Sequence, residues 1–200
     1  HEQHRRFSDF IDALKEAGVT FNIHHCCNSA GTLELPDFHR EMIRPGIIQY
    51  GYDASKEVLV TGTKIKPVMS LRCCITHLKT IYEGDCVGYG RHFTAKGPTK
   101  IATLPIGYAD GYNRALSSKI DVIVHGVRAH QVGNICMDQC MIDVSHIPDV
   151  KVGDEVVLFG EQGSECVSAD EIADTCHTII HEITCNINRR VPRIYVQNGK

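Results

Sequence analysis

The sequence predicts two parts of different fold class: the last β/α elements of a partial TIM-type barrel over residues 1–63, and a mainly β domain over residues 64–200. The first part alternates helix-like and strand-like stretches, which is typical of a β/α fold. From Pro67 onward, short apolar runs are separated by glycine turns, which favours an all-β module. A complete (β/α)8 barrel takes about 200–250 residues, so the first part holds only a fraction of one.

The β/α part begins with apolar residues at helical spacing, which predict a helix over about residues 7–17 that a glycine then ends. The stretches VTFNI (19–23) and MIRPGIIQYG (42–51) are predicted to be apolar strands, the second with a turn signal inside it. Between them, Ser29 is expected to begin a second helix.

In the β part, apolar runs bounded by turn residues predict strands in LRCCITHLKTI (71–81), KIATLPIG (100–107), DVIVHG (121–126), CMIDVS (140–145) and VGDEVVLFG (152–160). One helix is predicted to interrupt them. Ser168, with Glu171 three residues later, forms a capping box, and an apolar stripe continues as far as Ile183.

Charge and hydropathy exclude several partners. The formal net charge of -3 gives no reason to expect nucleic acid or an anionic membrane surface as a partner. No apolar run approaches the roughly 18 residues that a membrane helix needs, so no direct membrane contact is expected. The chain opens HEQHRRF, with neither an initiator Met nor a signal peptide, which suggests a piece from inside a longer, cytoplasmic protein.

The ten cysteines and the histidines beside some of them raise the question of a metal. The chain is long and ordinary in apolar content, so the cysteines are interpreted as free thiols of a reducing cytosol rather than a disulfide framework. The residues of HHCC (24–27) cannot all converge on one ion if they form a strand, because side chains alternate faces. His177 and His181 share a face of the predicted helix without an evident third ligand, so no metal is expected.

Two tyrosines lie in unusual settings. Tyr89 stands between two glycines in VGYG, on a backbone that something bulky can approach closely. Tyr108 lies in LPIGYADGYNR, where an apolar strand ends and an Asp-Gly turn follows. Together with VGNICMDQ (132–139) and RVPRIY (190–195), these stretches resemble the C-terminal half of alanine racemase, a fold-type III enzyme that uses pyridoxal 5'-phosphate (PLP).

The resemblance implies a reaction and a C-terminal β-barrel fold. The family interconverts L-alanine and D-alanine, and D-alanine is a precursor of peptidoglycan. One base removes the Cα proton from one face of the substrate, and a second base delivers a proton to the opposite face. It implies that Tyr89 is one of these catalytic bases. The other is a lysine of the N-terminal half that also forms the Schiff base with PLP. None of the ten lysines here lies in the family's lysine motif, so the chain alone is expected to be inactive.

The resemblance also implies a cofactor site in the β/α part. The family segment H-x-x-N-S matches His25 to Ser29, and its serine holds the phosphate of PLP. The family segment R-x-G matches Arg44 and Gly46, and the backbone amides of Gly46 and Ile47 are then expected to reach the phosphate. The arginine hydrogen-bonds the pyridine nitrogen. Because arginine cannot accept a proton, it leaves that nitrogen largely unprotonated and tempers the electron sink.

Substrate contacts and the oligomeric state follow from the same family. Met137 is expected to face the active site of a partner subunit, with Cys136 beside it, and Tyr108 and Arg114 to line the substrate entry corridor. In the family the catalytic tyrosine also crosses the interface, which implies a head-to-tail homodimer whose active sites are shared between subunits.

Two positions depart from the family pattern. Asn134 stands where the family commonly has arginine, and Arg189 stands where a tyrosine near the phosphate often precedes the RVPR tail. Three alternatives therefore remain at this point: a serine racemase of the same family, a non-catalytic dimerisation or binding module, and a metal-binding β protein using residues 24–27 or His177 and His181.

Overall fold

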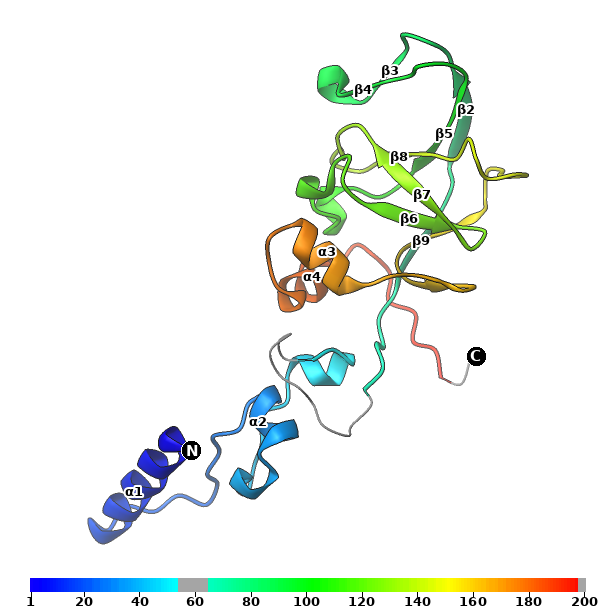
Figure 1. Ribbon diagram of the computed structural model, residues 1–200. Coiled ribbons are helices and arrows are strands. Elements are labelled where there is room, and N and C mark those ends of the chain that lie inside the picture. Colours follow the sequence, from blue (N-terminus) through cyan, green and yellow to red (C-terminus); the bar gives the residue numbers. More distant parts are fainter. Residues whose placement is uncertain (54–64, 198–200) are drawn as a thin grey trace. The chain divides into compact units, whose positions relative to one another are not determined.

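The computed structural model describes residues 1–53 and 65–197, which are shown in Figure 1. Its contacts divide the chain into two compact units, His1–Val68 and Met69–Lys200. The predicted boundary between residues 63 and 64 lies outside the described residues. No helix in the described part of the chain is long and apolar enough to cross a membrane.

The first unit consists of short helices. They are α1 (Glu2–Glu16), α2 (Ser29–Glu34) and the 3-10 helices η1 (Pro36–Phe38) and η2 (Ile47–Tyr50). Helix α1 ends before Gly18, whose φ of +80° favours glycine, as predicted. The helix is held to the segment after α2 by the stacked rings of His4 and Phe38 and by a 2.7 Å hydrogen bond from Arg40 to Ser8.

The two strands predicted in this unit do not form. Residues 19–23 have no regular secondary structure, and residues 42–51 contain η2 instead of a strand. A strand is stable only when a neighbouring strand pairs with its backbone, and no strand lies between residues 1 and 53. Phe21 and Ile23 are consequently 56% exposed.

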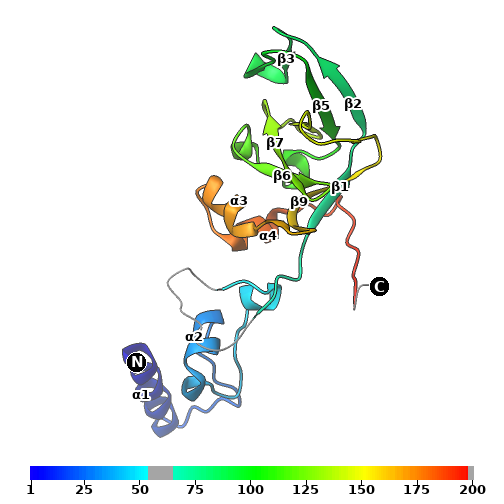
Figure 2. The ribbon, with the colours of Figure 1, turned by 45° about the vertical axis from the view of Figure 1, so that its right-hand side comes forward.

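The second unit is built on an eight-stranded antiparallel sheet with the order β1-β9-β6-β7-β8-β5-β2, and β10 pairs with β9. Only Ile75 and Thr76 separate β1 from β2, yet these strands lie at opposite ends of the order, so the sheet must curl round as in a barrel (Figure 2). The strands are β1 (Leu71–Cys74), β2 (His77–Ile81), β5 (Thr99–Leu104), β6 (Asp121–Val124), β7 (Val127–Val132), β8 (Cys140–Asp143), β9 (Glu155–Gln162) and β10 (Glu165–Val167).

The run 71–81, predicted as one strand, therefore divides into two. Ile75 N donates to the carbonyl of Asp154, and Thr76 N donates to the carbonyl of Thr103, so the chain passes from one edge of the curled sheet to the other within two residues. The predicted mainly β class is confirmed for this unit. The strands β7 and β10 were not predicted, because polar side chains interrupt their apolar character.

The helix predicted after Ser168 is broken into α3 (Ala169–Thr175) and α4 (Ile180–Asn186). Ser168 caps α3 as predicted, since its hydroxyl accepts a 3.0 Å hydrogen bond from Glu171 N. The break comes at His177, whose φ of +55° is incompatible with a continuing helix. His177 therefore lies between the two helices and His181 lies in α4, so the prediction that they share a face of one helix was wrong.

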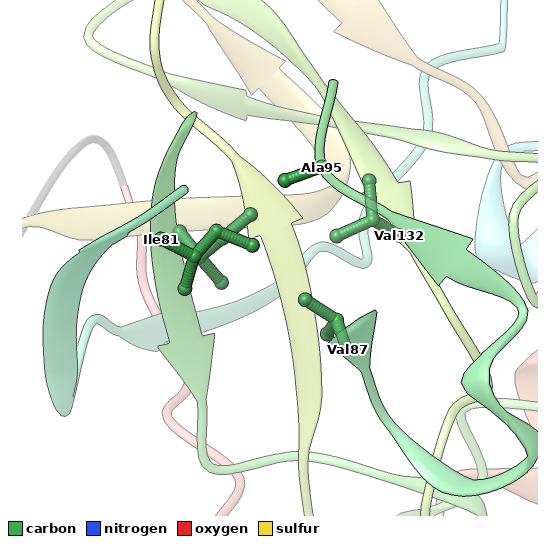
Figure 3. Close-up of a cluster of buried hydrophobic side chains, with 5 residues drawn as sticks. Ile81, Val87, Ala95 and Val132 are labelled. Carbon is green, nitrogen blue, oxygen red and sulfur yellow. The ribbon is translucent and has the colours of Figure 1, made fainter. Parts of the chain in front are cut away.

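A small hairpin of β3 (Cys86–Val87) and β4 (Phe93–Thr94) projects from one end of the curled sheet. It is anchored by a buried apolar cluster, which we call the hairpin cluster (Figure 3). The hairpin cluster comprises Ile81, Val87, Ala95, Ile101 and Val132, with Phe93 and Met141 packed against it. Because both hairpin strands contribute to it, the turn between them has a fixed base.

Candidate functional site

The turn of the β3–β4 hairpin carries Tyr89. Gly88 and Gly90, on either side, have φ of +76° and +78°, which L side chains rarely adopt. The side chain between them is turned outward, since Tyr89 is 80% exposed. The two glycines thus allow the turn, and the side chain between them projects into solvent.

Asn134 contacts this turn from the end of β7. Its Nδ2 donates a 2.8 Å hydrogen bond to the carbonyl oxygen of Tyr89. The sequence singled out Asn134 only as a departure from the family pattern, and a link to Tyr89 across 45 residues had no sequence signal.

Tyr108 and Met137 lie on two loops that touch through their backbones. Tyr108 N donates to the Cys136 carbonyl at 3.1 Å, and Ala109 N donates to the Met137 carbonyl at 3.0 Å. A Cβ at Gly107 would lie 2.2 Å from the Cys136 oxygen, so this approach requires glycine. The structure thus brings Tyr108, Cys136 and Met137 together, with Tyr108 43% and Met137 54% exposed.

Arg190 joins these two loops to the C-terminal segment. Its Nε donates a 2.6 Å hydrogen bond to Asp110 Oδ1, and its Nη2 pairs with Asp138. The other oxygen of Asp110 accepts a 2.9 Å hydrogen bond from Gly107 N. The sequence motifs GYADGY, CMDQ and RVPR are therefore parts of one network, although Asp110, Asp138 and Arg190 were not predicted as site residues.

Burial and hydrogen bonding act on Asp110 in opposite directions. Burial raises the pKa of its carboxyl, whereas the hydrogen bonds from Arg190 and Gly107 N lower it, and the net pKa lies below the ordinary value. The carboxylate is 10% exposed and is held ionised by its partners. Arg114 begins the neighbouring helix η5 (Arg114–Leu116) and is exposed, as is Arg189.

The first unit holds the other group of predicted site residues. Ser29 is buried, and its Oγ accepts a 2.9 Å hydrogen bond from Gly46 N. A Cβ at Gly46 would lie 3.6 Å from that oxygen and would fill the space beside it. Ile47 follows as the first residue of η2, where the backbone amides have no intrahelical acceptor. Ser29, Gly46 and Ile47 thus form a small polar cradle.

His25 and Arg44 lie near this cradle in the chain. The Arg44 backbone N donates to the Cys27 carbonyl at 2.9 Å, and its Nη2 donates to the Cys26 carbonyl at 3.3 Å. His25 is exposed. The cradle belongs to the first unit and Tyr89 to the second, so each is described within its own unit.

Three of the four residues of HHCC (24–27) have hydrogen-bond partners within the first unit. His24 Nδ1 lies 2.9 Å from Glu41 Oε2, and the thiols of Cys26 and Cys27 both reach the Phe38 carbonyl. Among the described residues, no group of three or more His, Cys, Asp or Glu side chains is arranged to hold a metal ion. All ten cysteines are free.

Comparison with known families and proteins matches both units. The model of the alanine racemase C-terminal domain matches residues 68–195, and that of the alanine racemase N-terminal domain matches residues 1–54. Alanine racemase 1 of Clostridium acetobutylicum is 46% identical over 100% of this chain and 52% of its own length. The alanine racemase of Clostridium tetani is 48% identical over 98% of this chain and 51% of its own.

Solved structures agree with these relatives. Alanine racemase of Clostridium difficile in complex with cycloserine has a TM-score of 0.92 at 42% identity, covering 100% of this chain and 52% of that one. Alanine racemase of Bacillus anthracis with bound L-Ala-P has a TM-score of 0.93 at 39% identity, covering 99% and 51%. The chain spans about half the length of the relatives it matches. Since both domain models match and the C-terminal one covers more than half of the residues, the chain belongs to the alanine racemase family.

Proposed function

We propose that this chain is the C-terminal half of a PLP-dependent alanine racemase, an isomerase that interconverts L- and D-alanine by two-base transfer of the Cα proton. The observation that carries the proposal is the outward presentation of Tyr89, 80% exposed on a glycine-flanked turn, in a chain whose whole length aligns with 52% of an alanine racemase. In this proposal the chain supplies one of the two bases and part of the cofactor site.

Tyr89 would exchange a proton with Cα through its phenol oxygen. A tyrosine has an ordinary pKa of about 10, so it works as a base at neutral pH only beside a positive group. The family resemblance places such a group, and the lysine that serves as the second base, in the N-terminal half. Neither base can invert the substrate alone, because inversion needs proton removal on one face and delivery on the other.

The cradle of the first unit has the donors that a phosphate requires. Ser29 Oγ and Gly46 N lie 2.9 Å apart, the helix that follows offers free amides, and glycine leaves the space beside them open. Ser29, Gly46 and Ile47 would hold the phosphate of PLP, with Arg44 at the ring nitrogen and His25 nearby. Bound PLP would supply the electron sink that makes the Cα proton removable at neutral pH.

A homodimer fits the exposed apolar side chains of the second unit. Tyr89, Tyr108 and Met137 are all substantially exposed despite their size. In the proposed dimer Tyr89 and Met137, with Cys136 beside the latter, would face the partner's active site, and Tyr108 and Arg114 would line the substrate entry. The network of Arg190 would keep Tyr108 and Met137 in register.

Alanine is the preferred substrate in this proposal, because each relative named above carries the name alanine racemase; serine remains the alternative. The product D-alanine would serve peptidoglycan synthesis. The free state of all ten cysteines supports the reducing cytoplasm as the compartment. The positions of Asn134 and Arg189 are where a shift in substrate preference would originate.

A chimaera tests the proposal. The part of Clostridium acetobutylicum alanine racemase 1 that this chain does not match is joined ahead of residue 1, and racemisation is measured in both directions with PLP. We expect activity, and a loss of about 10²–10⁴ in kcat for Tyr89→Phe, which removes only the proton-transferring oxygen. The matched control is Tyr82→Phe, since Tyr82 is also exposed, at 64%, and should have no effect. Full turnover by the Tyr89→Phe chimaera would end the assignment of Tyr89 as a base.

A further inference from the structure

The turn that carries Tyr89 is restrained from the side by one residue of a distant segment. Asn134 lies two residues beyond the end of β7, and its Nδ2 donates a 2.8 Å hydrogen bond to the Tyr89 carbonyl. We propose that Asn134 is a positioning residue for Tyr89, fixing the backbone from which the phenol projects. This inference rests on the proposed function, in which Tyr89 is a base.

The backbones of the two segments meet closely enough for a short side chain to bridge them. A Cβ at Gly133 would lie 2.8 Å from the Val87 carbonyl oxygen, and one at Gly88 would lie 3.4 Å from Asn134 N. Both glycines also have positive φ, +71° and +76°. The sequence VGN after β7 therefore does two things: Gly133 allows the approach, and Asn134 makes the hydrogen bond across it.

The turn has reason to need this restraint. Within it, the hydrogen bond from Arg91 N to the Gly88 carbonyl is long, at 3.4 Å. Arg91 has a φ of +51°, which is disfavoured for a residue with a side chain. The hairpin cluster fixes Val87 and Phe93 at the base of the hairpin, but Tyr89 itself is 80% exposed and has little packing of its own.

Asparagine suits this task better than a long cation would. Its amide has few rotamers to lose, so the donor is held in one place at small entropic cost. It is also neutral, and it therefore adds no charge beside a tyrosine whose proton affinity matters to the reaction. The asparagine that stands here in place of the common arginine is thus interpreted as suited to restraining the turn.

The first test uses the 200-residue chain and trypsin, which cleaves after Arg91 within the turn. Asn134→Asp keeps the shape of the side chain but replaces the donor with an oxygen that repels the Tyr89 carbonyl. We expect cleavage after Arg91 to become about fivefold to tenfold faster, the factor that corresponds to losing one ordinary hydrogen bond. The control is Asn113→Asp, where Oδ1 accepts from Ala115 N at 2.9 Å and can continue to do so. An unchanged cleavage rate in Asn134→Asp would overturn the proposal.

The second test uses the chimaera and separates positioning from general structure. Asn134→Asp should lower kcat about tenfold with unchanged KM for alanine and unchanged PLP content, because misorientation of a base affects the chemical step. Asn134→Gln, which restores the amide, should recover part of the loss. In the Tyr89→Phe background, Asn134→Asp should have no further effect, since Asn134 acts only through Tyr89.

The outcomes distinguish the inference from the function on which it rests. If Tyr89→Phe loses activity while Asn134→Asp turns over like the parent, or if the two losses multiply, the positioning role is wrong and the proposed function stands. If Tyr89→Phe is fully active, the proposed role of Tyr89 is itself wrong, and the positioning role fails with it.

Discussion

The two units of this chain share similar apolar residues but bury them very differently. In His1–Val68, helix α1 has no buried residue, and Phe10 is 61% exposed. In Met69–Lys200, Phe159 of β9 is 1% exposed, within a sheet that curls back on itself. The burial of an apolar side chain therefore depends on whether neighbouring strands cover it and not on the composition of the unit. The first unit has no strand over residues 1–53 to cover its apolar side chains, whereas the strands of the β unit cover one another.

Replacing one phenylalanine by alanine in each unit should show the difference in burial most clearly. Phe159→Ala removes a fully buried ring and should lower the free energy of unfolding by about 3–5 kcal/mol. Phe10→Ala removes a mostly exposed ring and should change it by about 0.5 kcal/mol or less. Urea denaturation followed by circular dichroism measures both. Equal losses would mean that α1 is packed as well as β9.

Removing an ion pair should also cost more stability in the second unit than in the first, but the difference between the units should be smaller than for the phenylalanines. Arg190→Gln leaves the buried carboxylate of Asp110 without its charged partner and should lower the free energy of unfolding at pH 7. Arg5→Gln removes pairs with Glu2 and Asp9 on the exposed surface of α1, and a smaller change in the free energy of unfolding is expected because solvent screens exposed ion pairs.

The Asp110 pair also predicts a pH dependence. Because the pKa of Asp110 is lowered in the folded state, its contribution to stability is present above the unfolded pKa of about 3.9 and is lost as the pH falls through the folded value. Below about pH 4, Asp110→Asn should therefore lose less stability on acidification than the parent does. If the free energy of unfolding fell in parallel for the parent and for Asp110→Asn as the pH is lowered, the pair of Asp110 and Arg190 would not contribute to stability.

Helix caps test the same difference between the two units locally. Ser168→Ala removes the cap of α3, which lies against the β unit, and should destabilise that unit by about 1 kcal/mol. Asn28→Ala removes the cap of α2, whose Oδ1 accepts from Gly31 N, and should loosen only residues near α2. Hydrogen exchange read by mass spectrometry separates the two cases. Faster exchange throughout Met69–Lys200 in Asn28→Ala would contradict the expectation that the loss of this cap has only a local effect.

The sequence predicts those features that depend on local pattern. The N-terminal cap of α3 by Ser168 and the glycine end of α1 both follow from a few neighbouring residues and are confirmed. The Glu171 carboxylate, which a capping box would use, instead pairs with Arg128. The strands 19–23 and 42–51 were wrong, because a strand depends on a partner that local pattern does not reveal.

Contacts between distant segments could not be predicted from the sequence for the same reason. Arg190 meets Asp110 across 80 residues, and Asn134 meets Tyr89 across 45. Each residue lies in a motif that the sequence singles out, but the letters of a motif do not say which other motif it will touch. The motifs thus indicate where the site residues are, and the curled sheet determines how they meet.

In the proposed function this chain carries only part of a racemase active site, and an assay of the 200-residue chain itself tests that claim most directly. Purified chain is incubated with PLP and L-alanine, D-alanine is quantified by chiral chromatography, and the protein is then reduced with borohydride and analysed by mass spectrometry. We expect no D-alanine above the blank that contains PLP alone, and no specific lysine modified among the ten, since none lies in the motif of the family's cofactor lysine. Two copies of the chain in a dimer would not change this result. Racemisation above the blank, with PLP reduced onto one particular lysine of this chain, would contradict the claim.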